Sequence, residues 1–140
     1  GKRGVGLSRA QNYGYDFEDY KKWQKENLVI IAQIEHINGV NNLREIIGVD
    51  GIDAVIIGPY DLSGSLGYPG DFTKIELQTA LNNVKNICKE SCFPLGYHVV
   101  DPNPELVKSK INEGYNFIAF STDFYFMGNN SIEMMNKLKK

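Results

Sequence analysis

Hydrophobic and polar positions form a repeating pattern along the chain, in which a short apolar run is followed by a segment with apolar residues three and four positions apart. The apolar, β-branched runs predict strands at 28–34, 53–57, 94–100 and 117–120. The segments with helical spacing predict helices at 17–27, 38–47, 73–91, 103–113 and 131–139. The chain therefore alternates strands and helices.

The order of these elements predicts a parallel α/β sheet with right-handed crossovers. The first run, 28–34, is continuously apolar, as in a strand that is buried on both faces. After the second strand, Gly58 and Pro59 predict a loop. Four strand–helix units can form a small open doubly wound sheet or half of an eight-stranded barrel, and length alone leaves both open.

Composition is that of a soluble globular unit, with 140 residues, 42% of them hydrophobic, and a formal net charge of -2. No long run of Lys or Arg indicates a nucleic acid or a membrane surface as partner, so a small molecule is expected. The longest apolar run is too short to cross a bilayer, and a cytoplasmic location is the default expectation. Cys88 and Cys92, four apart in a predicted helix, are expected to be reduced thiols.

Two carboxylates follow the first two strands, Glu35 directly and Asp61 after a short interval. The ends of neighbouring parallel strands meet at one rim, where two carboxylates repel each other unless a cation lies between them. A hard divalent ion such as Mg²⁺ or Mn²⁺ suits these ligands, and a 2-oxo acid can chelate its open positions. The alternative is that both residues only cap helices or form salt bridges.

Other residues near the same rim offer weaker evidence. Gly58 permits close approach of the backbone to a ligand, so that the next amides can bind a carboxylate, although Gly-Pro is also a common turn pair. His36 and His98 can serve as acid or base near neutral pH, but lone histidines more often have structural roles. Asp123, after the fourth strand, is expected at the rim with a role in loop structure.

Three motifs together resemble the HpcH/HpaI aldolase family, a branch of the phosphoenolpyruvate/pyruvate-binding barrels. They are Gln33-Ile34-Glu35, Val49-Asp50-Gly51-Ile52-Asp53 and Ile57-Gly58-Pro59-Tyr60-Asp61-Leu62-Ser63. Similar stretches begin at Arg3, Leu66 and Gly114, so the resemblance covers essentially the whole chain. It implies that residues 1–140 are the C-terminal half of a single (β/α)8 barrel domain, containing the last four βα units.

The resemblance also implies class II aldol cleavage, in which 4-hydroxy-2-oxo acids yield pyruvate and an aldehyde. The divalent metal would be Mg²⁺ or Mn²⁺, with Co²⁺ as a further option. The family's catalytic histidine and arginine are expected upstream of Gly1. The implied site consists of Gln33, Gly58, Pro59, Tyr60 and Asp61 for the substrate, and Glu35 and Asp61 for the metal.

Other interpretations remain open for a chain of this kind. A related chemistry, such as that of a citryl- or malyl-CoA lyase, would need a surface for CoA. A non-catalytic binding or assembly module could keep the metal and 2-oxo acid pocket without turnover. Four strands also cannot close a barrel, and exposed edges favour pairing with another chain. We therefore expect a homo-oligomer or pairing with a missing half-barrel.

Overall fold

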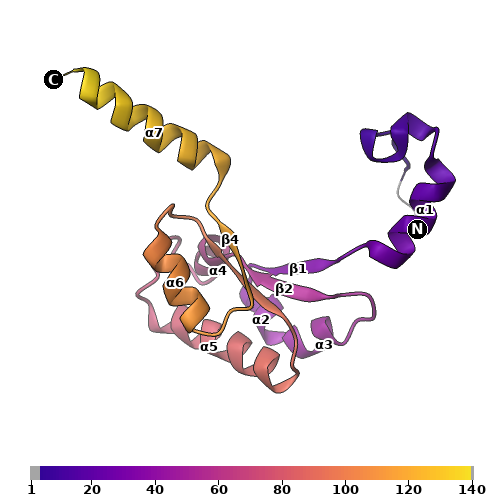
Figure 1. The fold of residues 1–140 in the computed structure, drawn as a ribbon. Helices are drawn as coiled ribbons and strands as arrows, with labels where there is room; N and C mark the ends of the chain where they lie inside the picture. The colour runs from indigo at the N-terminus through magenta and orange to yellow at the C-terminus, as the bar shows by residue number, and fades with distance from the viewer. Residues whose placement is uncertain (1–3, 140) are drawn as a thin grey trace.

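The computed structural model describes residues 4–139. Arg3, which opens one of the family-like stretches, lies outside the described residues. The elements follow one another in strand–helix order after a 3-10 helix and a first helix (Figure 1). Their bounds are η1 Arg9–Gly14, α1 Phe17–Asn27, β1 Ile31–Ile34, α2 Ile37–Asn41, α3 Leu43–Ile47, β2 Ala54–Ile57, α4 Pro59–Ser65, α5 Ile75–Glu90, β3 Leu95–Val99, α6 Pro104–Asn112, β4 Phe117–Phe120 and α7 Asp123–Leu138.

The four strands form one parallel sheet in the order β1-β2-β3-β4. The prediction of a parallel α/β sheet is confirmed. Each strand therefore lies beside the next one along the chain, as in a barrel wall, and the reversal of strand order that marks a doubly wound sheet does not occur within this sheet. Helices α2, α3, α5 and α6 cover one face, and the other face is open (Figure 1).

The hydrophobic core lies between the sheet and these helices. Along each strand the side chains alternate between the two faces, so every second residue enters the core. Val55 and Ile57 of β2 are fully buried there, packed with Leu43 of α3 and Val84 of α5. The interleaved positions, such as Gln33 of β1, face the open side.

Two predictions about the first strand and the last helix are wrong. The strand starts at Ile31, three residues later than expected, and it is not buried on both faces: Val29 is 66% exposed and Ile31 is 45% exposed. The reason is that, among residues 4–139, β1 pairs only with β2 and no helix covers its open side. The last helix starts at Asp123 rather than at residue 131, and it extends away from the sheet (Figure 1).

The segments after the first two strands also differ from expectation. The predicted loop at Gly58 and Pro59 is instead the start of α4, because proline at the first helical position lacks only an amide that the helix does not use. The predicted helix at 38–47 is two short helices that meet at Asn42. Cys92 is predicted from the sequence to lie in the same helix as Cys88. Helix α5 ends at Glu90, however, so Cys92 lies in the turn that follows it. Both cysteines are free thiols.

Candidate functional site

A pocket of about 310 Å³ lies at the carboxyl ends of the strands, and it contains several of the residues that the sequence singles out there, but not Glu35. All five substrate residues expected from the sequence border this one space. Its lining consists of Gln33, Gly58, Pro59, Tyr60, Asp61, His98, Val100, Phe124 and Tyr125. The register explains the grouping, because Gln33 pairs with Ile56, two residues before Gly58, and both strands end at the same edge.

Close packing around Gly58 brings the first carboxylate, Glu35, beside a residue of this pocket, although Glu35 is not among the residues that line it. A methyl group on Gly58 would lie 2.9 Å from Gln33 Nε2, 3.3 Å from Glu35 Cβ and 3.5 Å from Glu35 Oε2. The backbone of Gly58 is fixed by its amide, which donates to Ile34 O at 3.1 Å. Because Gly58 has no side chain, Gln33 and Glu35 can approach the start of α4 closely.

The second carboxylate, Asp61, lies in the first turn of α4 and is exposed. The first amides of a helix have no partner within the helix, and negative charge is favoured at this end. Within residues 4–139, the amides of Tyr60 and Asp61 donate to no backbone carbonyl, so they are available to a ligand. Both amides therefore lie at a pocket that Tyr60 and Asp61 themselves line.

Glu35 and Asp61 are the residues that could hold a metal at this pocket. Across residues 4–139, no three His, Cys, Asp or Glu side chains form a group suited to a metal ion. Mg²⁺ nevertheless commonly binds one or two carboxylates and completes its coordination with water and substrate oxygens. The donor set of two carboxylates therefore fits a hard divalent ion with open positions.

The two histidines have different environments. His36 precedes α2, and its Nδ1 accepts a hydrogen bond from the Asn38 amide at 3.1 Å, so it caps that helix. His98, on β3, is half-buried and lines the pocket, with its Nε2 3.4 Å from Ser121 O. His98 is therefore placed to contact a ligand, whereas His36 has a structural partner.

Asp123 has a local role in the structure. It lies in the first turn of α7, where its Oδ1 accepts a hydrogen bond from the Phe124 amide at 2.8 Å. The next two residues, Phe124 and Tyr125, line the pocket, and sequence reasoning missed them because it placed the last helix too late. Thr122 and Asp123 carry the missed signal, since Thr and Asp are favoured at a helix start.

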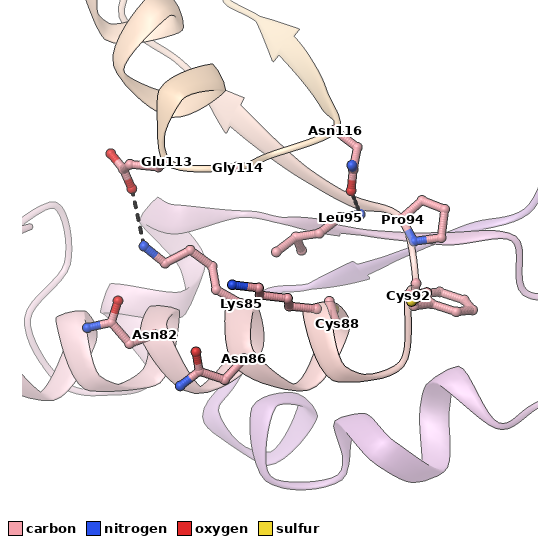
Figure 2. Close-up of a pocket in the computed structure, with 12 residues that line it drawn as sticks. Asn82, Lys85, Asn86, Cys88, Cys92, Pro94, Leu95, Glu113, Gly114 and Asn116 are labelled. Carbon is pink, nitrogen blue, oxygen red and sulfur yellow. Dashed lines mark hydrogen bonds and ion pairs between the residues drawn. The ribbon is translucent and has the colours of Figure 1, made fainter.

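A larger pocket of about 610 Å³ lies at the opposite end of the strands, between α5 and the turn before β4 (Figure 2). Two of its polar side chains have partners in the structure. Lys85 forms an ion pair with Glu113 at 3.4 Å, and Asn116 Oδ1 accepts a hydrogen bond from the Leu95 amide at 2.9 Å. These two interactions link α5 and β3 to the segment before β4.

The chain has clear relatives among known proteins. The family model described as HpcH/HpaI aldolase/citrate lyase matches residues 2–129. The 2-dehydro-3,6-dideoxy-6-sulfogluconate aldolase of Pseudomonas putida is 34% identical over 99% of this chain and 54% of its own length. A 2-keto-3-deoxy-L-rhamnonate aldolase of Escherichia coli O1:K1 is 35% identical over 88% of this chain and 46% of its own length. The chain thus spans about half the length of the curated relatives it matches.

A solved structure gives the same result for the fold. The crystal structure of an HpcH/HpaI aldolase/citrate lyase family protein from Burkholderia cenocepacia J2315 superposes with a TM-score of 0.81 and 26% sequence identity. The superposition covers the whole of this chain and 54% of that one.

No helix in the part of the chain described by the structure has the length and apolar character needed to cross a bilayer.

Proposed function

Because this chain belongs to the HpcH/HpaI aldolase/citrate lyase family, we propose that it carries the metal and pyruvate site of an aldolase. The reaction is the divalent-metal-dependent cleavage of 4-hydroxy-2-oxo acids to pyruvate and an aldehyde. One observation carries the proposal: the residues expected to bind the substrate line a single pocket. Glu35 reaches the same glycine from the neighbouring strand.

In this proposal residues 1–140 form the C-terminal half of one (β/α)8 barrel domain. The strand order β1-β2-β3-β4 with helices on one face supports it, because consecutive neighbours and an outer helix layer are what a barrel wall requires. The open face of the sheet is then the barrel interior. The exposed edge of β1 is where a further half-barrel, or a second copy of the chain, pairs with it.

The side chains of this chain then have distinct roles. Glu35 and Asp61 hold the divalent ion, Mg²⁺, Mn²⁺ or Co²⁺, which when bound polarises the keto group of the substrate. The amides of Tyr60 and Asp61 bind the substrate carboxylate at the start of α4, where the helix dipole favours an anion. Gln33 orients the substrate from β1. We also propose that the protein acts on a small molecule in the cytoplasm.

The first experiment is a calorimetric titration of the chain with pyruvate in Mn²⁺, repeated after chelation. Metal-dependent binding is the expected result. Glu35→Gln and Asp61→Asn should each abolish it, because each removes a negative ligand from the ion. Asp50→Asn is the matched control, since Asp50 is an exposed carboxylate in the turn before β2, at the opposite end of the strands.

The outcomes separate the alternatives. If both site variants bind pyruvate as tightly as the native chain does, Glu35 and Asp61 are excluded as the metal ligands. Metal-dependent binding of pyruvate, with no cleavage of a 4-hydroxy-2-oxo acid even when the remaining half-barrel is supplied, would identify a binding module instead of an aldolase.

A further inference from the structure

An aromatic wall, formed by Tyr60 and Phe72, stands beside the candidate pocket, which Tyr60 lines. The ring of Tyr60 meets the edge of Phe72 with centroids 4.9 Å apart and an interplanar angle of 79°. On the same side, a methyl group on Gly70 would lie 3.5 Å from Tyr60 Cε1, so the ring also packs against the backbone there. Aromatic pairs in this edge-to-face arrangement stabilise each other.

The loop that carries Phe72 is anchored on α4 through Ser63, which is 1% exposed. Ser63 Oγ accepts a hydrogen bond from the Gly70 amide at 2.9 Å and donates one to Tyr60 O at 2.6 Å. The Tyr68 amide donates to Ser63 O at 3.0 Å. One buried residue therefore holds both the loop and the turn that presents Tyr60, which is 46% exposed.

A second pocket, also of about 310 Å³, lies beyond this wall and shares Tyr60 and His98 with the first. Its lining between β3, α5 and α6 is rich in apolar and aromatic side chains, among them Phe72, Leu81, Tyr97 and Leu106. Its one lysine, Lys110, is already engaged: Nζ lies 2.8 Å from Glu113 Oε1 and 4.8 Å from the centroid of the Tyr97 ring.

The first pocket has further aromatic residues in its lining. Phe124 and Tyr125 line it from the first turn of α7. None of the nine described residues that line this pocket is Lys or Arg. A substrate held at Asp61 by its 2-oxo acid end thus meets aromatic rings with the rest of its chain.

We propose that these rings select the aldehyde half of the substrate, favouring 4-hydroxy-2-oxo acids with an apolar or aromatic group at C4 over those with a polyhydroxylated chain. This inference rests on the proposed function of the same site. Rings gain free energy by burying apolar area, whereas hydroxyl groups placed against them lose water without gaining partners. The discrimination is therefore made by the walls of the pocket, and the 2-oxo acid end is bound alike in both substrates.

The test compares two ligands that share the 2-oxo acid end, the pyruvate adducts of benzaldehyde and of glyceraldehyde. Calorimetry in Mn²⁺ should show the benzaldehyde adduct binding about tenfold more tightly, which is the effect of one added aromatic contact. Equal affinities, or tighter binding of the glyceraldehyde adduct, would overturn the inference. Pyruvate alone is titrated in the same series.

Variants test whether Tyr60 makes the discrimination. In Tyr60→Ala the ratio of the two dissociation constants should fall toward one, to the extent that the other rings do not replace Tyr60, and in Tyr60→Phe it should persist, because the ring remains. Tyr15→Ala is the control, since Tyr15 is 88% exposed and does not line the pocket. An unchanged ratio in Tyr60→Ala contradicts the assignment of selectivity to this ring.

The pyruvate titration separates the two proposals. If pyruvate binds and the adducts do not differ, only the selectivity is wrong. If neither pyruvate nor either adduct binds a folded sample, the proposed function fails and this inference fails with it.

Discussion

The two faces of the sheet differ in packing and in chemistry, although the same strands build both. On the helix side, Val55 and Ile57 are completely buried and Ile34 is 2% exposed. On the open side, Ile31 is 45% exposed and Gln33 leads to the candidate pocket. Alternate residues of β1 thus belong to different environments. Stability is concentrated on one face, and the proposed chemistry lies at the end of the other.

The largest loss of stability is expected from a cavity in the core on the helix side of the sheet. Leu43→Ala removes a fully buried side chain of α3. We expect the free energy of unfolding to fall by about 2–5 kcal/mol, because the lost transfer energy adds to the cost of the cavity. Urea unfolding followed by circular dichroism measures the change.

The matched variant on the open side is Ile31→Ala, which removes a comparable apolar side chain from β1. It should lower the free energy of unfolding by less than about 1 kcal/mol, since nearly half of the side chain is already in water. Similar losses in both variants would show that the open face is as well packed as the helix face, for example through association with another chain.

The next effect comes from a place where the open face is tightly packed. Gly96 of β3 lies under the ring of Phe117, and a methyl group there would clash with that ring. Gly96→Ala should lower the free energy of unfolding by about 1–3 kcal/mol through overpacking. Urea unfolding measures it, with Gly128→Ala as the control.

Gly128 lies in α7 with no atom within 4 Å of an added methyl group. Alanine there should stabilise the chain by about 0.5–1 kcal/mol through its better helix propensity. Combining Gly96→Ala with Phe117→Ala should recover part of the loss, because the clash then has no partner. A loss in the double variant equal to the sum of the two single losses would argue against the ring as the cause.

A smaller effect on stability is expected at high pH, where a buried tyrosine on the helix face ionises. Burial, with added repulsion from Glu113 and Tyr60, raises the pKa of Tyr97 to about 12 from 10.0. The folded state therefore keeps the proton longer than the unfolded state does. The stabilisation is complete below pH 10 and is lost as the pH rises through the folded value near 12.

Tyr97→Phe removes this titration from the helix face. Between pH 9 and pH 11, the native chain should lose about 1 kcal/mol more of its free energy of unfolding than the variant. Urea unfolding at both values measures the difference. Tyr15→Phe, at an exposed site, should behave as the native chain does; parallel losses in native chain and Tyr97→Phe would rule out Tyr97 as the group responsible.

The difference between the helix face and the open face also explains how much of the fold could be predicted from the sequence. Helix α1 has the expected bounds, and the four strands lie at or within the expected ranges, because periodicity reports which side chains enter a core. The environment of β1 could not be predicted, since burial on its open side depends on what lies across the sheet rather than on its own apolar run.

The site shows a similar limit. Strand ends identified Glu35 and Asp61, because parallel strands end at one edge, and the family resemblance added Gln33. The pocket also contains Phe124 and Tyr125, which lie some 60 residues or more farther along the chain. Whether these two residues reach the pocket depends on where α7 begins. Gly128, Asn129 and Asn130, which follow them, are weak helix formers, so the sequence pattern did not indicate a helix at this position. The start signal at Thr122 and Asp123 is local, whereas membership of the pocket is a tertiary property.

The sharpest test of the comparison has the smallest expected effect on stability. Gly58→Ala adds a methyl group that meets Gln33 Nε2 at 2.9 Å, Glu35 Cβ at 3.3 Å and Glu35 Oε2 at 3.5 Å. The closest of these atoms is the end of a flexible side chain that can move away. The backbone at Gly58, with φ -97° and ψ 92°, is accessible to alanine. The free energy of unfolding should therefore change by less than about 1 kcal/mol, because the reduced freedom of the unfolded chain offsets mild crowding.

Binding should respond far more than stability, since a displaced Glu35 no longer lies where a shared ion needs it. We expect Mn²⁺-dependent pyruvate affinity to fall by about tenfold or more, as occurs when the support of a metal ligand is disturbed. Gly128→Ala, remote on α7, should leave affinity unchanged. If Gly58→Ala binds as tightly as the native chain, the close approach of β1 to α4 is a packing detail, and the carboxylate of Glu35 reaches no ion at this pocket. If it binds weakly while folding normally, the open face holds chemistry that the stability of the sheet does not require.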